Sequence, residues 1–175
     1  MLCNKYKYIP QDFAVYFASE DFTHQEQNSI LCNMFQNHNA EILFSYRSDF
    51  VKFKFVVYEL LIKYDSDERT LTEAELIMKE VRISKIIPED AETYFIGVYF
   101  KLIKLQLMYS GKSYRKIKLR TLLHDFGYKR RTAVLLNEIT NTLKSLSMYA
   151  CLRNFAPCDI ASVGINDMII IRLID

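Results

Sequence analysis

Residues 111–146 read GKSYRKIKLRTLLHDFGYKRRTAVLLNEITNTLKSL, and this stretch decides which fold we expect. It combines a short helix, a glycine stop, a basic turn and a longer amphipathic helix. Between residues 112 and 131 only Asp125 is acidic, whereas eight residues are basic: Lys112, Arg115, Lys116, Lys118, Arg120, Lys129, Arg130 and Arg131. Two helices joined by a tight, positively charged turn are the arrangement that sets one helix into a DNA groove.

The first helix of this pair is predicted over residues 120–126. Its apolar side chains fall on one helical face: Leu119, Leu122, Leu123 and Phe126. Gly127 follows, at the position of a left-handed C-terminal cap, because glycine adopts that conformation without a steric penalty. The sequence therefore predicts a sharp stop before the basic turn.

The second helix is predicted over residues 132–148. Apolar residues recur at helical spacing and mark the face that docks on the core: Leu136, Ile139, Leu143 and Leu146. Polar side chains then lie nearer the opposite faces: Arg130, Arg131, Asn137, Thr140 and Asn141.

The elements around the helix pair complete a pattern. A long apolar helix is expected over residues 88–109, although paired strands would also fit its composition. A short strand is expected over residues 116–119, and two more over 149–153 and 168–173. This order resembles the winged-helix superfamily over about residues 89–174. Where that superfamily has a compact basic wing, residues 154–167 form a long hydrophobic connection.

The resemblance implies an α+β fold with a C-terminal winged helix-turn-helix that binds double-stranded DNA. Residues 132–146 would be the recognition helix, with its N-terminal end facing the major groove. The residues expected to bind nucleic acid are Lys112, Arg115, Lys116, Lys118, Arg120, Lys129, Arg130, Arg131 and Asn137. About six phosphate contacts would lower the affinity roughly a thousandfold between about 50 and 200 mM salt.

The charge is divided along the chain. Residues 1–90 hold 10 Lys or Arg and 15 Asp or Glu, a net charge of −5, whereas residues 91–175 hold 13 and 6, a net charge of +7. A basic half indicates a polyanion partner, and an acidic half is typical of a dimer or protein-binding surface. We therefore expect an acidic α/β region, residues 1–88, for oligomerisation or partner binding, and a nucleic-acid-binding domain, residues 89–175. A homodimer would set two recognition helices about one DNA turn apart.

The N-terminal region is predicted to mix helices and strands. Residues 1–22 read as irregular or strand-containing, residues 41–46 (EILFSY) as a strand, and residues 51–63 as either a strand or a buried helix. Thr23 with Glu26 three residues later is a capping box and predicts a helix to about residue 37. A second capping box, Thr72 with Glu75, predicts another helix, and residues 81–87 a further strand.

The four cysteines form no CxxC pair and the three histidines lie far apart, so no zinc site is expected. Without a secretory signal at the N-terminus, the thiols read as reduced and the protein as cytoplasmic. Cys151 and Cys158 would face each other if the chain turns between them, and a disulfide between them is the alternative to two reduced thiols. No apolar run reaches the roughly 18 residues that a membrane-spanning helix needs.

An enzymatic site is not indicated, and no cofactor is expected. The four glycines (Gly97, Gly111, Gly127 and Gly164) never cluster, so a phosphate-cradling loop is not predicted. The motifs GxSxG and HExxH do not occur. A nuclease would need carboxylates beside a lysine to hold Mg²⁺. The candidates are Glu59 with Lys63, and the acidic turn of Asp65, Asp67 and Glu68.

Three functions follow from these observations, in order of preference. The first is a non-enzymatic DNA-binding protein, a transcription regulator or a replication-initiation type factor of a small genetic element. The second is a protein-interaction module, such as a virus-encoded inhibitor of a host nucleic-acid defence complex, with the winged helix as its docking surface. The third is a nuclease or nuclease subunit that a winged helix targets to its substrate.

Overall fold

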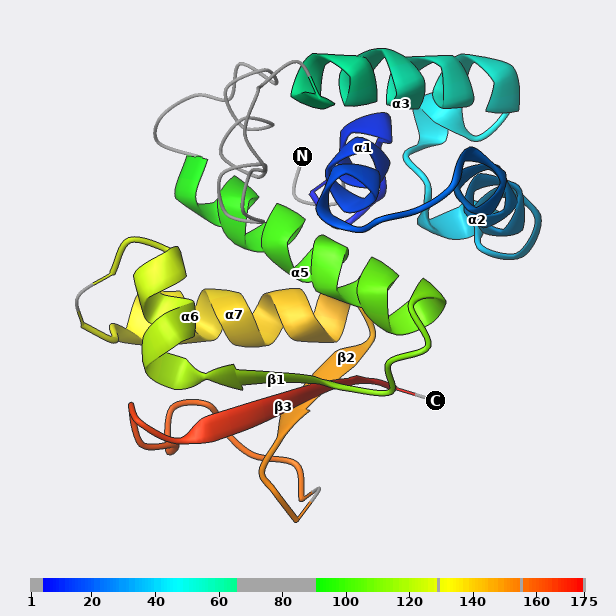
Figure 1. Ribbon diagram of the computed structural model, residues 1–175. Coiled ribbons are helices and arrows are strands. Elements are labelled where there is room, and N and C mark those ends of the chain that lie inside the picture. The colour runs from blue at the N-terminus through cyan, green and yellow to red at the C-terminus, as the bar shows by residue number, and fades with distance from the viewer. Residues whose placement is uncertain (1–4, 66–90, 129, 155, 175) are drawn as a thin grey trace. The chain divides into compact units, whose positions relative to one another are not determined.

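The computed structural model describes residues 5–65, 91–128, 130–154 and 156–174, and their architecture is α+β (Figure 1). The chain divides into two compact units, an N-terminal unit (Met1–Ile86) and a C-terminal unit (Ile87–Asp175). The helices of the N-terminal unit are α1 (Pro10–Ser19), α2 (His24–Asn37) and α3 (Phe50–Asp65), with two short 3-10 helices at Asn39–Glu41 and Phe44–Tyr46. The C-terminal unit contains α5 (Ala91–Tyr109), β1 (Arg115–Lys118), α6 (Leu119–Asp125), α7 (Ala133–Ser145), β2 (Met148–Cys151) and β3 (Met168–Leu173). In the described ranges no helix is long and apolar enough to cross a membrane.

Aromatic side chains form the core of the N-terminal unit, where α1 packs against α3. Phe13 of α1 meets Phe53 of α3 edge-on, with ring centroids 5.6 Å apart. Phe35 of α2 approaches Phe53 in the same way, at 5.1 Å. Edge-to-face geometry sets the positive ring edge against the negative ring face, so these contacts stabilise the unit beyond simple burial.

Two expectations for this unit are wrong. Residues 10–19 form α1 rather than an irregular or extended segment. Pro10 begins this helix, and the Asp12 carboxylate accepts a hydrogen bond from the Ile9 amide at 2.8 Å. Residues 41–46 pass through 3-10 turns instead of a strand, since their ladder amounts to one parallel bridge between Tyr8 and Ile42. The described part of this unit is therefore helical and contains no strand.

The helix predicted from Thr23 is confirmed as α2. The Thr23 hydroxyl accepts from the Glu26 amide at 3.3 Å, and the Glu26 carboxylate accepts from the Thr23 amide at 2.8 Å. The ambiguous residues 51–63 belong to α3, a single helix. The helix expected from Thr72 and the strand over residues 81–87 lie outside the described residues.

A three-stranded antiparallel sheet organises the C-terminal unit, with strand order β1-β3-β2. The register pairs Ile117 with Ile169 on one side of β3 and Ala150 with Ile171 on the other. Because alternate residues of a strand share a face, these four side chains lie together, and all four are buried. Helices α5 and α7 contact β3 and β2 respectively, and Figure 1 shows them along the same side of the sheet.

The connection between β2 and β3 first turns back along β2, with an antiparallel bridge between Cys151 and Pro157. Residues 157–160 then line a small cavity together with Leu143 of α7. The connection carries two buried apolar residues of its own, Ile160 and Val163. On the sheet, Cys151 and Ile170 are register partners on the face opposite Ala150 and Ile171, and both are buried. We conclude that the first part of this long hydrophobic connection folds back on β2 as a short hairpin, and that its later part lies beside α7.

Candidate nucleic-acid interface

The start of α6 is fixed by the connection that precedes β3. The backbone amide of Leu119 donates to the Asp167 carbonyl at 3.0 Å, and that of Arg120 donates to the Ile165 carbonyl at 2.8 Å. The first amides of a helix have no partner within the helix, so these two bonds satisfy groups that would otherwise need water. They also hold the beginning of α6 against the sheet.

The end of α6 is a Schellman motif centred on Gly127. The Gly127 amide donates to His124 at 2.8 Å, the Tyr128 amide donates to Leu123 at 2.9 Å, and the φ of Gly127 is +78°. Phe126 points into the core, with its ring centroid 5.1 Å from that of Tyr99 on α5. The glycine stop predicted from the sequence is confirmed, and it turns the chain sharply toward α7.

α7 begins at a threonine cap and presents two different faces. The Thr132 hydroxyl accepts a hydrogen bond from the Leu135 amide at 3.2 Å. The inner face is buried and consists of Leu135, Leu136, Ile139, Thr142 and Leu143. The outer face of α7, which we define as Val134, Asn137, Asn141 and Lys144, is exposed along the whole helix. None of the exposed residues of α7 is acidic. The acidic residue Glu138 lies at the edge of this face and is half-buried.

The two arginines of the turn have different surroundings. The Arg131 guanidinium donates from Nη1 to the Val163 carbonyl at 2.7 Å and to the Ala161 carbonyl at 3.3 Å. It therefore ties the turn to the β2–β3 connection. Arg130 is exposed and has no hydrogen-bond or ion-pair partner among the described residues. Of this adjacent pair, Arg130 is the side chain that is open to a ligand.

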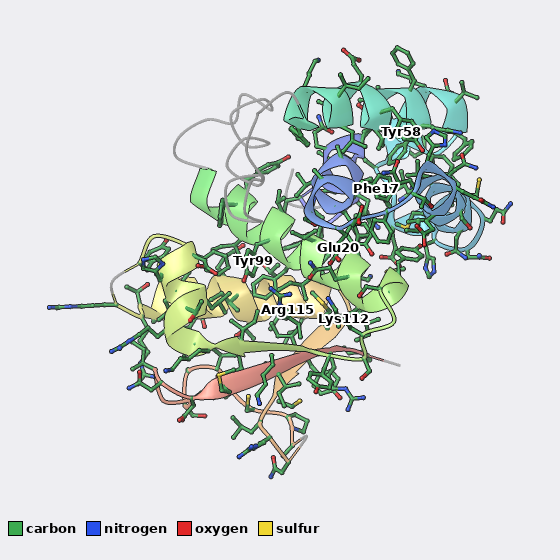
Figure 2. All side chains as sticks on the ribbon, in the orientation of Figure 1. Phe17, Glu20, Tyr58, Tyr99, Lys112 and Arg115 are labelled. Carbon is green, nitrogen blue, oxygen red and sulfur yellow. The ribbon has the colours of Figure 1, made fainter. Side chains whose placement is uncertain are left out.

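The basic residues of β1 do not share one face. Arg115 is half-buried and lies on the face of the sheet that contains Ile117, while Lys116 and Lys118 are exposed on the opposite face. Lys112 lies in the connection between α5 and β1, and Arg115 is the first residue of β1; both are labelled in Figure 2. Both of these side chains already have interaction partners, so neither is counted as open. Lys129 lies outside the described residues.

Six exposed cations of the C-terminal unit have no partner within the described part of the chain. They are Lys116, Lys118, Arg120, Arg130, Lys144 and Arg153. The exposed acids of the same part, Asp159 and Asp167, accept hydrogen bonds from the backbone amides of Ala161 and Gly164, both at 3.0 Å. Lys144 and Arg153 were not among the residues predicted from the sequence. Lys144 could have been predicted from the sequence, because it lies seven residues after Asn137 on the same helical face.

A small cavity of about 130 Å³ lies between α7, β2 and the β2–β3 connection. It is lined by Thr140, Leu143, Lys144, Met148, Tyr149, Ala150, Pro157, Cys158, Asp159 and Ile160. Burial is the main cause that raises the pKa of the Cys158 thiol, followed by the nearby Cys151 and Asp159. Burial also raises the pKa of Cys151, whereas Arg172 opposes that shift. Both thiols are free and protonated near neutral pH, which is the opposite of an activated nucleophile.

The carboxylates considered as Mg²⁺ ligands of a nuclease are Glu59 and the acidic residues at and after the end of α3. Glu59 is paired with Lys63 at 3.0 Å on the exposed surface of α3. Asp67 and Glu68 lie outside the described residues. Within the described ranges, no group of three or more histidine, cysteine, aspartate or glutamate side chains is placed to hold a metal ion.

Comparison with known proteins found no matching family, no similar curated protein and no similar solved structure.

Proposed function

We propose that the protein is a non-enzymatic DNA-binding protein of the winged-helix type that acts in transcription control or replication initiation. In this proposal α7 is the recognition helix, and its outer face enters the major groove of double-stranded DNA. The order α5, β1, α6, α7, β2, β3 with sheet order β1-β3-β2 supports it, because a winged helix has this succession of elements. The single observation that carries the proposal is the chemistry of the outer face of α7.

Amide side chains dominate that face. Asn137 and Asn141 are one helical turn apart and exposed. An asparagine amide can donate to and accept from the edge of adenine at once, and an apolar side chain such as Val134 fits against a thymine methyl. Arg130, just before the helix, is within reach of the guanine edge or the backbone phosphates.

The open cations supply the nonspecific part of the binding energy. Neutralising phosphates releases condensed counterions, so the affinity falls steeply as salt is added. If the six open cations all contact phosphate, the affinity is expected to fall roughly a thousandfold between about 50 and 200 mM salt. Lys112, Arg115 and Arg131 are excluded from this set, because each of them already has partners.

The test is fluorescence anisotropy with a labelled random duplex over a salt series. Arg130→Ala is expected to weaken binding several-fold and to reduce the salt slope by about one. Lys63→Ala removes the same charge from the N-terminal unit and should bind as the wild type does. Selection from a random-sequence library should also enrich a motif that Asn137→Ala no longer enriches. Equal affinity and equal slope for wild type, Arg130→Ala and Lys63→Ala would overturn the assignment of α7.

A protein-docking role for the same element has one observation in its favour. Val134 is 81% exposed at the first turn of α7, and an apolar side chain in that position also suits a protein partner. This second function, a protein-interaction module, is preferred if the wild type fails to bind duplex at low salt. The observation that would then support it is a purified partner protein that binds the wild type stoichiometrically but does not bind the Val134→Ser variant.

A further inference from the structure

Helix α3 of the N-terminal unit is apolar on two sides. Its inner side places Phe53, Val57, Leu60 and Tyr64 in the core, all of them buried. Its outer side exposes Val51, Phe55 and Ile62, at 77%, 68% and 71% of their surface. A helix that is apolar around most of its circumference is normally covered on both sides. Because the inner side is already packed, α3 cannot rotate to bury the outer side.

The outer residues form a continuous stripe, which we call the α3 stripe and define as Val51, Phe55, Tyr58 and Ile62. Their spacing of four, three and four residues keeps them within about 60° of one another around the helix. Tyr58 is half-buried at one edge, stacked on His24 with ring centroids 5.0 Å apart. This stacking holds the tyrosine ring in place beside the exposed side chains.

We propose that the α3 stripe binds the α3 stripe of a second copy of this chain, with the two helices antiparallel. A spacing of four, three, four reads the same in both directions. A twofold axis midway between Phe55 and Tyr58 therefore sets Val51 against Ile62 and Phe55 against Tyr58. Such an interface is self-complementary, as twofold symmetry requires, and all four apolar residues are used.

The charges beside the stripe fit the antiparallel orientation. On one side the stripe is flanked by the exposed Lys52, Glu59 and Lys63. Lys54 lies on the other side, where its ammonium donates to the side chain of Asn28 on α2. In the antiparallel pair, Glu59 of each copy lies within about two residues of Lys52 of the second copy. Because Glu59 is also paired with Lys63 of its own copy at 3.0 Å, one carboxylate then lies between two ammonium groups at each of two places on the rim. This pairing makes no use of α7, so it stands apart from DNA binding.

The proposal is tested by sedimentation velocity of the full chain over a protein concentration series. The wild type is expected to form a dimer, and Val51→Glu to shift the dissociation constant by at least about tenfold, because the new charge would be placed against the apolar Ile62 of the second copy. Val134→Glu is the matched control, since it places the same charge on a valine that is 81% exposed on α7. This control should dimerise as the wild type does but bind duplex less well. Circular dichroism checks that both variants fold.

Disulfide trapping reports the orientation separately. An antiparallel pair should link Val51→Cys to Ile62→Cys when the two variants are mixed. Val51→Cys alone should not cross-link to itself, because its two copies stand about 16 Å apart along the helix axis. The wild type, with its natural cysteines, is the background control.

Several outcomes would overturn the proposal. These are a wild type that stays monomeric at every concentration, a Val51→Glu variant that dimerises normally, and efficient linking of Val51→Cys to itself. Binding of a monomeric wild type to anionic lipid vesicles, lost in Val51→Glu, would assign the α3 stripe to a membrane surface instead. If the wild type dimerises but does not bind DNA, the pairing through α3 stands and the proposed function of α7 fails. If it binds DNA but stays monomeric, the proposed function of α7 stands and the pairing through α3 fails.

Discussion

Helices α3 and α7 solve the same packing problem on their inner faces but differ on their outer faces. Each buries one apolar stripe, with Val57 of α3 and Ile139 of α7 at 0% exposure. Outside, α3 presents Val51, Phe55 and Ile62, whereas α7 presents mainly the amides of Asn137 and Asn141. Because the inner faces already pack in the core, the side chains of the outer faces are available to bind a partner. An apolar partner fits α3, and a polar, negatively charged partner fits α7.

The largest predicted effect separates the inner from the outer face of α7. Ile139→Ala should lower the free energy of unfolding by about 2–5 kcal/mol, because it removes buried methyl groups and leaves a cavity. Asn137→Ala, on the outer face two residues earlier, should change it by less than about 0.5 kcal/mol. Urea denaturation followed by circular dichroism measures both. A comparable loss in the two variants would mean that the outer face is needed for folding and is not reserved for a partner.

A smaller effect distinguishes the two arginines that precede α7. Arg131→Ala should cost about 1 kcal/mol of stability, since the hydrogen bonds to the carbonyls of Val163 and Ala161 are lost from a partly exposed site. Arg130→Ala should leave stability within about 0.5 kcal/mol of the wild type. Thermal melts of the two variants, which have equal charge, give the comparison. If Arg130→Ala proved the less stable of the two, the roles assigned to these side chains would have to be exchanged.

The C-terminal unit could be predicted well from the sequence because its signals are local. The stop at Gly127, the cap at Thr132 and the apolar stripe through Ile139 each act within one or two helical turns. Each has the geometry expected: φ of +78° at Gly127, a hydroxyl-to-amide bond at Thr132, and complete burial at Ile139. The strong strand signal of residues 168–173 is confirmed as β3 for the same reason.

The N-terminal unit was harder because burial removes periodicity. Residues 12–17 of α1 are all buried, so the run shows no polar face and resembles a strand. Only Pro10 and Asp12 marked it as a helix start. The interface raised a different difficulty, since Arg131 is tied to Val163, 32 residues away, and nothing near either residue in the sequence signals that bond. By contrast, the separation of Arg115 from Lys116 onto opposite faces follows from strand alternation and could have been predicted.

The smallest predicted effect concerns the N-termini of α2 and α7, and it extends the comparison to their charges. Hydrogen bonds from the Thr23 side chain and backbone lower the pKa of Glu26 below its ordinary value of 4.5. A carboxyl whose pKa is lowered by folding stabilises the protein above its unfolded pKa, and this contribution is lost as the pH falls through the folded pKa. Glu26→Gln should therefore lower the melting temperature at neutral pH, and by less at acidic pH, where the Glu26 carboxyl takes up its proton.

α7 lacks such an acid, because Leu135 occupies the position that Glu26 has in α2. Thr132→Ala should thus cost about 1 kcal/mol at both pH values. The comparison is made by measuring the melting temperature at the two pH values for the wild type, Glu26→Gln and Thr132→Ala. A pH-independent difference between Glu26→Gln and the wild type would show that the carboxylate charge has no part in the α2 cap. The absence of an acidic residue from the first turn of α7 leaves the positive end of that helix dipole open to phosphate, in keeping with its proposed partner.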